Sequence, residues 1–216
     1  MSNTLQDLRQ NYTRDQLELD HEETPRDPFK FFTMWLDDAK SCEQIIEPNA
    51  MTLATSSSDG APSARIVLLK GFGDDGFIFY TNSQSQKGRQ LKDNPLAALV
   101  FWWSPLERQV RVEGRVSKVS PEVSDAYFQS RPRSSQLGAW SSPQSQEISA
   151  RDLLSENFKH YSALYQTETI PRPPHWGGYQ LRPHRFEFWQ GRESRLHDRL
   201  AFSLEGDAWR VGRLAP

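Results

Sequence analysis

The sequence predicts a mainly β protein, an antiparallel barrel with added helices. About six short runs of apolar and β-branched residues, bounded by turn sequences, are spread along the 216 residues. Segments with helical spacing stand between these runs. Aromatic residues make up 12% of the chain, which indicates a packed core rather than a disordered protein. Together these features favour a barrel into which helices are inserted.

The first expected helix begins at Pro28. Asp27 can cap it, proline suits its first position, and apolar residues from Phe31 to Ala39 recur at helical spacing. The residues before it are hydrophilic and lack an apolar period. We therefore expect residues 1–25 to form a mobile N-terminal arm and residues 26–216 to form a single domain.

The spacing of apolar residues and the positions of turn-forming residues predict the remaining strands, turns and helices. Strands are expected at 51–56, 63–70, 77–81, 96–103 and 109–119, and within 177–214. Turns are expected at Asp59-Gly60 and at Glu205-Gly206-Asp207. Further helices are expected at 83–92, from Ser120-Pro121 to about residue 130, and as a longer amphipathic helix over 149–165.

Charge and cysteine content limit the function classes. The formal net charge is −2, so no overall basic field favours nucleic acid as a partner. The single cysteine, Cys42, cannot form an intramolecular disulfide, and no cluster of cysteines and histidines has the spacing of a metal site. Residues 1–20 lack the apolar core of a signal peptide, and no later window has a membrane-spanning length. A cytoplasmic protein without a metal or a membrane partner is expected.

Residues 71–76 match the dinucleotide-binding pattern G-x-G-x-x-G letter for letter. That pattern needs a following helix, whose N-terminus faces the pyrophosphate, whereas residues 77–80 continue as a strand. Asp74 and Asp75 would also repel phosphates. We therefore interpret this segment as a hairpin turn.

Three segments contain candidate anion-binding residues. Arg65 and Lys70 bracket an apolar strand. Either both cations are simply solvated at the ends of the strand, or the strand backbone lies along a flat ligand and the two cations contact its phosphates. Tyr127, Arg131 and Ser135 are spaced by four, and Pro132 should end their helix at Arg131. This grouping fits an ordinary polar helix end or, alternatively, a phosphate monoester site.

The third segment is the run from Trp189 to Arg199. If it forms one alternating strand, Arg195, His197 and Arg199 project to one side, with no run of acids beside them, and Leu196 and Asp198 project to the other. Such a face is either a solvent-exposed basic ridge or a site for an anionic ligand.

Taken together, these segments resemble the pyridoxamine 5'-phosphate oxidase family of FMN enzymes. The motifs that carry the resemblance occur in order over nearly the whole chain: Arg65-Ile66-Val67-Leu68-Leu69-Lys70, Phe79-Tyr80-Thr81-Asn82, Leu106-Glu107-Arg108-Gln109-Val110, Ser130-Arg131-Pro132-Arg133, Gly138-Ala139-Trp140, and Glu187-Phe188-Trp189-Gln190-Gly191 with Arg195-Leu196-His197-Asp198-Arg199. The resemblance implies an FMN-binding split β-barrel. It also implies a homodimer with FMN at the interface, both chains contributing to each site.

The resemblance further implies a role for each matched residue. FMN would be contacted by Arg65, Ile66, Val67, Leu68, Leu69, Lys70, Tyr80, Thr81, Lys87, Gln109, Gln144, Ser145, Trp189 and Arg199. The substrate phosphate would be held by Lys70, Tyr127, Arg131 and Ser135, and the reacting carbon would be faced by the catalytic pair Arg195 and His197. Arg9 and Tyr12 of the arm would help to close the site. Asp198 is expected to be structural.

The implied reaction is the FMN-dependent oxidation of pyridoxamine 5'-phosphate and pyridoxine 5'-phosphate to pyridoxal 5'-phosphate. Oxygen would be the acceptor, with release of hydrogen peroxide and, from the amine, ammonia. One position departs from the family pattern, because Gln86 stands where the family usually has arginine. Since charge-assisted hydrogen bonds are roughly twice as strong as neutral ones, weaker FMN retention is expected.

Two alternatives differ in the residues that they need. A split-barrel flavin reductase on another substrate would keep the FMN residues without needing Tyr127, Arg131 and Ser135. A non-catalytic β-barrel would use aromatics such as Trp102 and Trp103 to stack nucleic-acid bases.

Overall fold

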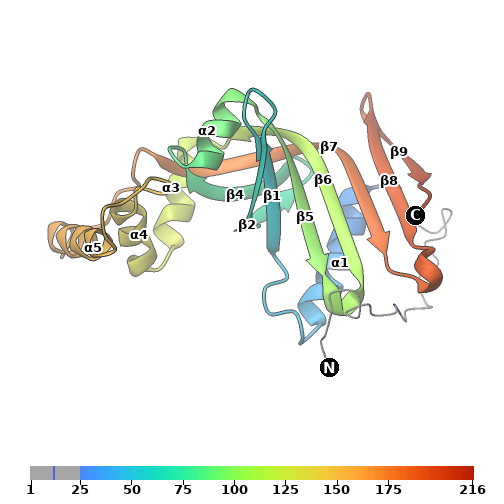
Figure 1. The fold of residues 1–216 in the computed structure, drawn as a ribbon, viewed down its shortest axis with the longest axis horizontal. Helices are drawn as coiled ribbons and strands as arrows, with labels where there is room; N and C mark the ends of the chain where they lie inside the picture. The colour runs from blue at the N-terminus through green and yellow to red at the C-terminus, as the bar shows by residue number, and fades with distance from the viewer. Residues whose placement is uncertain (1–11, 13–24) are drawn as a thin grey trace. The chain divides into compact units, whose positions relative to one another are not determined.

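The computed structural model describes Tyr12 and residues 25–216. Within these residues, nine strands form one sheet with the hydrogen-bonded order β2-β1-β5-β6-β7-β4-β3, to which β8 adds beside β7 and β9 beside β8 (Figure 1). The strands are β1 (Ala50–Ser56), β2 (Pro62–Leu68), β3 (Gly71–Gly73), β4 (Gly76–Asn82), β5 (Leu96–Trp103), β6 (Arg108–Lys118), β7 (Trp176–Gln190), β8 (Asp198–Glu205) and β9 (Ala208–Arg213). The α-helices are α1 (Pro28–Ser41), α2 (Gln86–Asp93), α3 (Pro121–Ser130), α4 (Arg133–Ser141) and α5 (Asp152–Leu164). The predicted class, mainly β with added helices, is confirmed.

The chain divides into two compact units built from interleaved segments. The first unit comprises residues 1–52, 99–113 and 183–216, and the second comprises 53–98 and 114–182. We describe each unit by itself.

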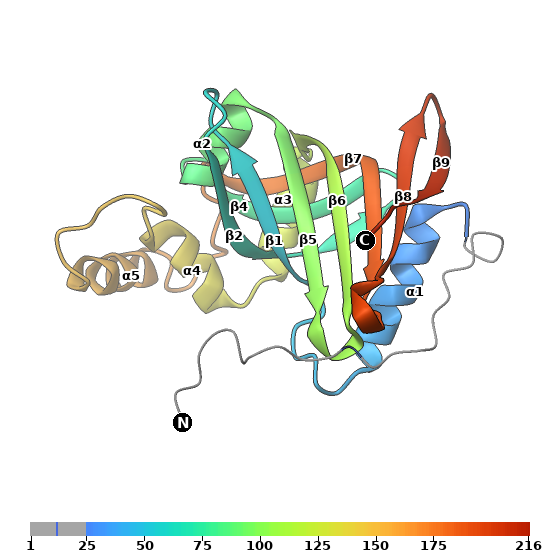
Figure 2. The ribbon, with the colours of Figure 1, turned by 45° about the vertical axis from the view of Figure 1, so that its right-hand side comes forward.

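In the first unit, α1 packs on the paired strands β7 and β8 (Figure 2). The Asp27 carboxylate accepts hydrogen bonds from the backbone N–H groups of Phe29 and Lys30 and so caps the helix as predicted. The buried face of α1 places the Phe31 ring 4.3 Å from the Phe188 ring. This aromatic contact holds the helix against the sheet.

The second unit confirms the hairpin at residues 71–76. β3 pairs antiparallel with β4, and Gly73 lies opposite Gly76. β4 then pairs with the first half of β7, where Tyr80 lies opposite Gly178. A Cβ atom on Gly178 would lie 2.8 Å from the Tyr80 ring and 2.5 Å from Val119, so only glycine fits beneath this ring.

The helices of the second unit differ from expectation in two places. α3 is capped by Ser120 and ends at Ser130, as Pro132 predicted. α4 follows almost at once and was not predicted, because its sequence lacks a side-chain cap at its N-terminus. α5 begins at Asp152 rather than at residue 149, also without a side-chain cap.

No helix in the described part of the chain is long and apolar enough to cross a membrane.

Candidate active site

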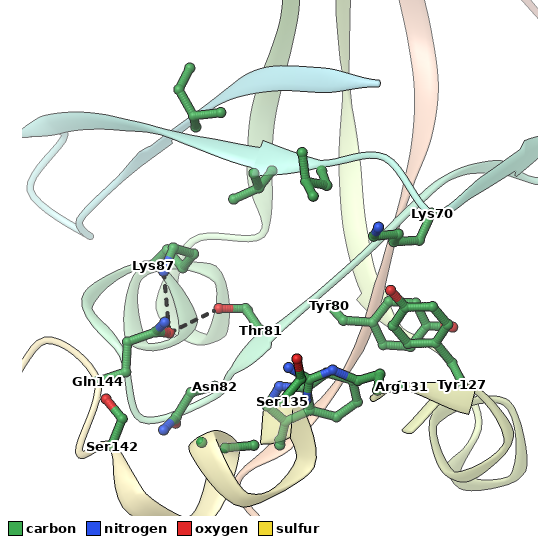
Figure 3. Close-up of a pocket in the computed structure, with 16 residues that line it drawn as sticks. Lys70, Tyr80, Thr81, Asn82, Lys87, Tyr127, Arg131, Ser135, Ser142 and Gln144 are labelled. Carbon is green, nitrogen blue, oxygen red and sulfur yellow. Dashed lines mark hydrogen bonds between the residues drawn. The ribbon is translucent and has the colours of Figure 1, made fainter. Parts of the chain in front are cut away.

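The second unit contains a cavity of about 490 Å³ (Figure 3). Its wall combines the end of β2, strand β4, the helices α2, α3 and α4, and the first residue of β7. It is lined by Ile66, Val67, Leu68, Lys70, Tyr80, Thr81, Asn82, Lys87, Tyr127, Arg131, Ser135, Gly138, Ala139, Ser142, Gln144 and Trp176. The described residues that line it include three cationic side chains and no aspartate or glutamate, which favours an anionic ligand.

One end of the cavity brings together Lys70, Tyr127, Arg131 and Ser135 (Figure 3). Lys70 lies in the short link between β2 and β3, Tyr127 lies in the last turn of α3, and Ser135 lies in the first turn of α4. Arg131 lies at the junction of the two helices with an extended backbone. The break that Pro132 imposes between α3 and α4 therefore points their polar groups into one space.

The Arg131 guanidinium is partly buried without a carboxylate. Its Nη1 atom is buried and has no hydrogen-bond partner among the described residues. The guanidinium carbon lies 4.7 Å from the centroid of the Trp176 ring. Burial lowers the pKa of Arg131, although the guanidinium stays charged at neutral pH. A buried guanidinium donor that lacks a protein acceptor is suited to bind an oxyanion.

Tyr80 stacks on Tyr127 at this end of the cavity. Their ring centroids are 3.9 Å apart and their planes differ by 19°. Burial, and in second place the nearby Tyr127, raises the pKa of Tyr80. The Tyr80 phenol therefore remains protonated at neutral pH.

The other end of the cavity contains Lys87, Thr81 and Gln144 (Figure 3). The Gln144 side-chain oxygen accepts hydrogen bonds from Thr81 Oγ1 at 3.2 Å and from Lys87 Nζ at 3.4 Å. Burial, together with the positive charge of Arg65, lowers the pKa of Lys87. A second anionic group would relieve the repulsion between these two cations.

Arg65 is held by uncharged oxygens. Its Nη1 atom donates to the Leu53 carbonyl at 3.1 Å and to Thr55 Oγ1 at 2.6 Å, and its Nη2 atom donates to Ser63 Oγ at 2.6 Å. Burial lowers the pKa of Arg65. These neutral partners fix the guanidinium without cancelling its charge.

Most of the predicted residues of the second unit line this one cavity. The exceptions are Arg65, Leu69 and Ser145, which are not among the lining residues. The lining residues that sequence reasoning missed are Asn82, Gly138, Ala139, Ser142 and Trp176. Asn82, Gly138 and Ala139 belong to motifs that carry the resemblance, although no role was assigned to them, whereas nothing local in the sequence distinguishes Ser142 or Trp176.

The first unit contains the other predicted residues, Tyr12, Gln109, Trp189, Arg195, His197 and Arg199. The Trp189 and His197 rings lie 4.6 Å apart. The Tyr12 ring meets both edge to face, at 5.6 Å from Trp189 and 5.5 Å from His197. Gln109 is a half-buried residue of β6. Arg9 lies outside the described residues.

His197 has a defined proton position when neutral. Its Nδ1 atom accepts a hydrogen bond from the Arg192 backbone N–H at 3.1 Å, which leaves the proton on Nε2. Burial, and in second place the charge of Arg195, lowers the pKa of His197. At neutral pH the imidazole is therefore neutral and can donate from Nε2.

The prediction that residues 195–199 form one alternating strand is wrong. Residues Glu193–Arg195 form a 3₁₀ turn, and β8 begins only at Asp198. Ser194 and Arg195 have φ values of 54° and 62°, left-handed conformations that no strand contains. Exposed Arg195 thus lies in a turn and half-buried His197 in the short link between that turn and β8, so period-two alternation does not apply to them.

One of the three cations of this run, Arg199, has an acidic partner that the local sequence did not indicate. The Glu187 carboxylate accepts from Arg199 Nε at 3.0 Å and pairs with Arg199 Nη2 at 2.9 Å. Asp198 pairs with Arg213 at 2.6 Å and with Arg192 at 3.3 Å, in keeping with the structural role expected for it.

The position of Trp103 does not fit the nucleic-acid alternative, because base stacking needs an exposed ring. It is 2% exposed, and its indole N–H donates to the Pro48 carbonyl at 2.9 Å. Trp103 is therefore a core residue.

Comparison with known proteins identifies the family. Residues 38–165 match the family model described as pyridoxamine 5'-phosphate oxidase, and residues 176–216 match the pyridoxine 5'-phosphate oxidase C-terminal dimerisation region. A pyridoxine/pyridoxamine 5'-phosphate oxidase of Synechocystis is 56% identical over 99% of this chain and 98% of its own. The protein of the same name from Ectopseudomonas mendocina is 52% identical over the full length of both chains.

Solved structures agree in fold. PhzG from Burkholderia lata, solved with tetrahydrophenazine-1-carboxylic acid, is 32% identical, with a TM-score of 0.87 over 94% of this chain and 98% of its own. A pyridoxamine 5'-phosphate oxidase-related, FMN-binding protein of Nostoc punctiforme gives a TM-score of 0.71 at 18% identity, over 89% of this chain and 100% of its own. The predicted split-barrel fold is confirmed.

Proposed function

Because the chain belongs to the pyridoxamine 5'-phosphate oxidase family, we propose that it binds FMN and oxidises pyridoxamine and pyridoxine 5'-phosphates to pyridoxal 5'-phosphate. Oxygen accepts the two electrons and leaves as hydrogen peroxide. The amine substrate also consumes water and releases ammonia. The observation that carries the proposal is the buried Nη1 donor of Arg131, which has no hydrogen-bond partner among the described residues and lies in a cavity that they line without a carboxylate.

The substrate phosphate binds at the Arg131 end of the cavity. Arg131 offers directed N–H donors, Lys70 adds a mobile cation, and the Tyr127 and Ser135 hydroxyls donate single hydrogen bonds. A phosphate dianion satisfies all of these groups, whereas an unphosphorylated ring leaves Arg131 buried without an acceptor. The site therefore selects the phosphorylated forms of the vitamin.

The other end of the cavity fits the FMN phosphate. Lys87 lines this end, and Arg65, which does not line the cavity, adds a positive charge that acts on Lys87; both cations have uncharged partners. Thr81 and Gln144 add neutral hydrogen-bonding groups. Gln86 is the exposed first residue of α2, so it can supply a neutral donor but no further charge. FMN, when bound, supplies the redox chemistry by accepting hydride from the substrate carbon and returning the electrons to oxygen.

Arg195 and His197 orient the substrate ring near its reacting carbon, C4'. The neutral His197 donates from Nε2 to a polar substituent of the ring, since its Nδ1 is occupied by the Arg192 N–H. The exposed Arg195 provides positive charge that stabilises developing negative charge. The Tyr12 ring covers the pair formed by Trp189 and His197 and helps to exclude water from the closed site.

Two copies of the chain form the working enzyme. The C-terminal match is to a dimerisation region, and the site residues divide between two separate units of the chain. We place FMN at the dimer interface, where one copy supplies the cavity and the other supplies Trp189, Arg195, His197 and Arg199.

Two measurements on the purified protein test the proposal. The absorbance spectrum should show bound flavin, and pyridoxine 5'-phosphate should release peroxide while unphosphorylated pyridoxine at equal concentration should not. Arg131→Met should raise KM for the phosphate ester at least about 10-fold, because a charge-assisted hydrogen bond contributes roughly 1.5–3 kcal/mol.

Arg133→Met is the matched control, because the Arg133 guanidinium donates to backbone carbonyls and does not line the cavity. Equal turnover of both alcohols by a yellow protein would instead favour a flavin enzyme for another substrate. A protein without flavin that retains single-stranded nucleic acid would contradict the proposal altogether.

A further inference from the structure

We propose that Trp176 is a positioning residue for substrate binding: its indole orients the Arg131 guanidinium and the Tyr127 ring toward the substrate phosphate. The inference rests on the proposed function, because it assigns the phosphate to this end of the cavity. It adds to that function a residue with no recognisable signal in its own sequence surroundings.

The indole lies where a counter-ion of Arg131 would be expected. Trp176 is 8% exposed and lines the cavity, and the Arg131 guanidinium carbon lies 4.7 Å from its ring centroid. The Phe128 ring lies farther from the same guanidinium, at 5.7 Å. The negative face of the indole therefore attracts the cation and limits where it can point.

An aromatic partner has a functional advantage over a carboxylate at this position. A buried aspartate would hold Arg131 firmly, but it would also neutralise the guanidinium and repel a phosphate dianion. A ring face orients the cation by a weaker attraction and leaves its N–H donors available. This matches the observation that Arg131 Nη1 has no acceptor among the described residues.

The same indole also stacks near Tyr127, a second residue of the proposed phosphate-binding group. The Trp176 plane differs from that of Tyr127 by 7° and from that of Tyr80 by 12°, at centroid distances of 6.2 and 5.3 Å. With Tyr80 and Tyr127 themselves 3.9 Å apart, the three rings form one nearly parallel group. Removing the indole would therefore loosen both Arg131 and Tyr127.

Hydrogen bonds and an ion pair connect Trp176 to α3, the helix that carries Tyr127. Its backbone N–H donates to the Pro173 carbonyl at 3.0 Å, and its carbonyl accepts from Arg172 Nη1 at 2.7 Å. Arg172 also pairs through Nε with Asp125 of α3 at 2.6 Å. Since α3 carries Tyr127 and Arg131 follows its last residue, these bonds fix the start of β7 against the residues that Trp176 orients.

The test measures ligand binding without turnover. Anaerobic calorimetry on the protein loaded with reduced FMN, which cannot accept a hydride from the ligand, gives Kd for pyridoxine 5'-phosphate and for pyridoxine. Trp176→Leu should raise Kd for the phosphate ester between about 2-fold and 30-fold and leave that for pyridoxine unchanged, the range set by cation–π attraction at exposed and desolvated sites. Trp176→Phe, which keeps a ring face, should restore part of the affinity.

Trp140→Leu is the matched control for loss of an indole. Trp140 packs on the same apolar cluster as Trp176, but its indole donates to the Pro171 carbonyl and does not line the cavity. If Trp140→Leu raises Kd for the phosphate ester equally, or if Trp176→Leu weakens both ligands alike, Trp176 is merely structural and the inference is overturned.

A double-mutant cycle tests the route through Arg131. In an Arg131→Met background, Trp176→Leu should weaken binding of the phosphate ester by less than it does in the wild type. An undiminished effect there would also overturn the inference. Failure of the proposed function has a different signature, namely a wild-type protein that binds the phosphate ester but releases no peroxide from it in air.

Discussion

Replacing Glu187 by glutamine should destabilise the protein far more than the same change at Glu205. Glu187 is 4% exposed, and its carboxylate bridges Arg199, at 2.9 and 3.0 Å, and Arg111, at 3.0 Å. Glu205 pairs with Arg210 at only 2.5 Å, but the side chains of both partners are about 60% exposed. Distance alone would rank the two pairs in the opposite order.

The magnitude follows from burial. Each charge-assisted hydrogen bond contributes roughly 1.5–3 kcal/mol against about 0.5–1.5 for a neutral one, and glutamine keeps only one acceptor oxygen. Arg199 and Arg111 retain 27% and 39% exposure, so water offsets part of the loss. We expect Glu187→Gln to lower the free energy of unfolding by about 2–3 kcal/mol. Glu205→Gln should lower it by less than about 1 kcal/mol, as for exposed pairs.

Urea unfolding at fixed protein concentration measures both variants, because a dimer couples stability to concentration. The midpoint for Glu187→Gln should fall by about 1 M with an unchanged slope. Equal midpoints for the two variants would refute the reasoning that burial, rather than distance, decides the strength of these pairs.

Two further predictions concern the imidazole and a glycine. His197 should titrate below its ordinary pKa of 6.5, and Arg195→Leu should raise that pKa, as followed by NMR of the ring; a pKa that stays the same or falls would contradict the assigned effect of Arg195. Because a lowered folded-state pKa disfavours protonation, the stability that neutral His197 contributes should be present above pH 6.5 and should be lost as pH falls from there through the lower folded-state pKa. Gly76→Ala should cost at least about 2 kcal/mol in thermal unfolding, since its φ is 125° and a Cβ would lie 2.1 Å from the Leu181 carbonyl oxygen. Gly73→Ala, with no atom within 4 Å of its Cβ, should change little, and equal losses would argue against this steric reason.

Local chemistry in the sequence determined where several elements begin and end. Asp27 and Ser120 cap α1 and α3 as predicted, because a capping side chain bonds backbone groups within a few residues of itself. Pro132 ends α3 for the same kind of local reason. α4 was missed because no side chain caps its start, so its stability depends on packing rather than on a sequence signal.

The resemblance in sequence also determined much of the candidate site. Residues from segments as distant as Lys70, Arg131 and Gln144, which the resemblance assigned to one site, line one cavity. Trp176 could not be found in this way, because an aromatic residue at the start of a strand is an ordinary feature of a β protein. Its importance arises only from the ring and cation that the fold brings beside it.

Only the tertiary structure decided which cations are free. Arg199 and Glu187 are twelve residues apart, and they meet because the register of β7 and β8 sets Trp189 opposite Arg199 and Glu187 opposite Ala201. A sequence lists charges but not the strand register that neutralises some of them. Thus the chain alone predicted a mainly β fold, its family and a group of residues that line one cavity. Folding decided that Arg199 is paired and that Arg131 Nη1 is buried without a hydrogen-bond partner among the described residues.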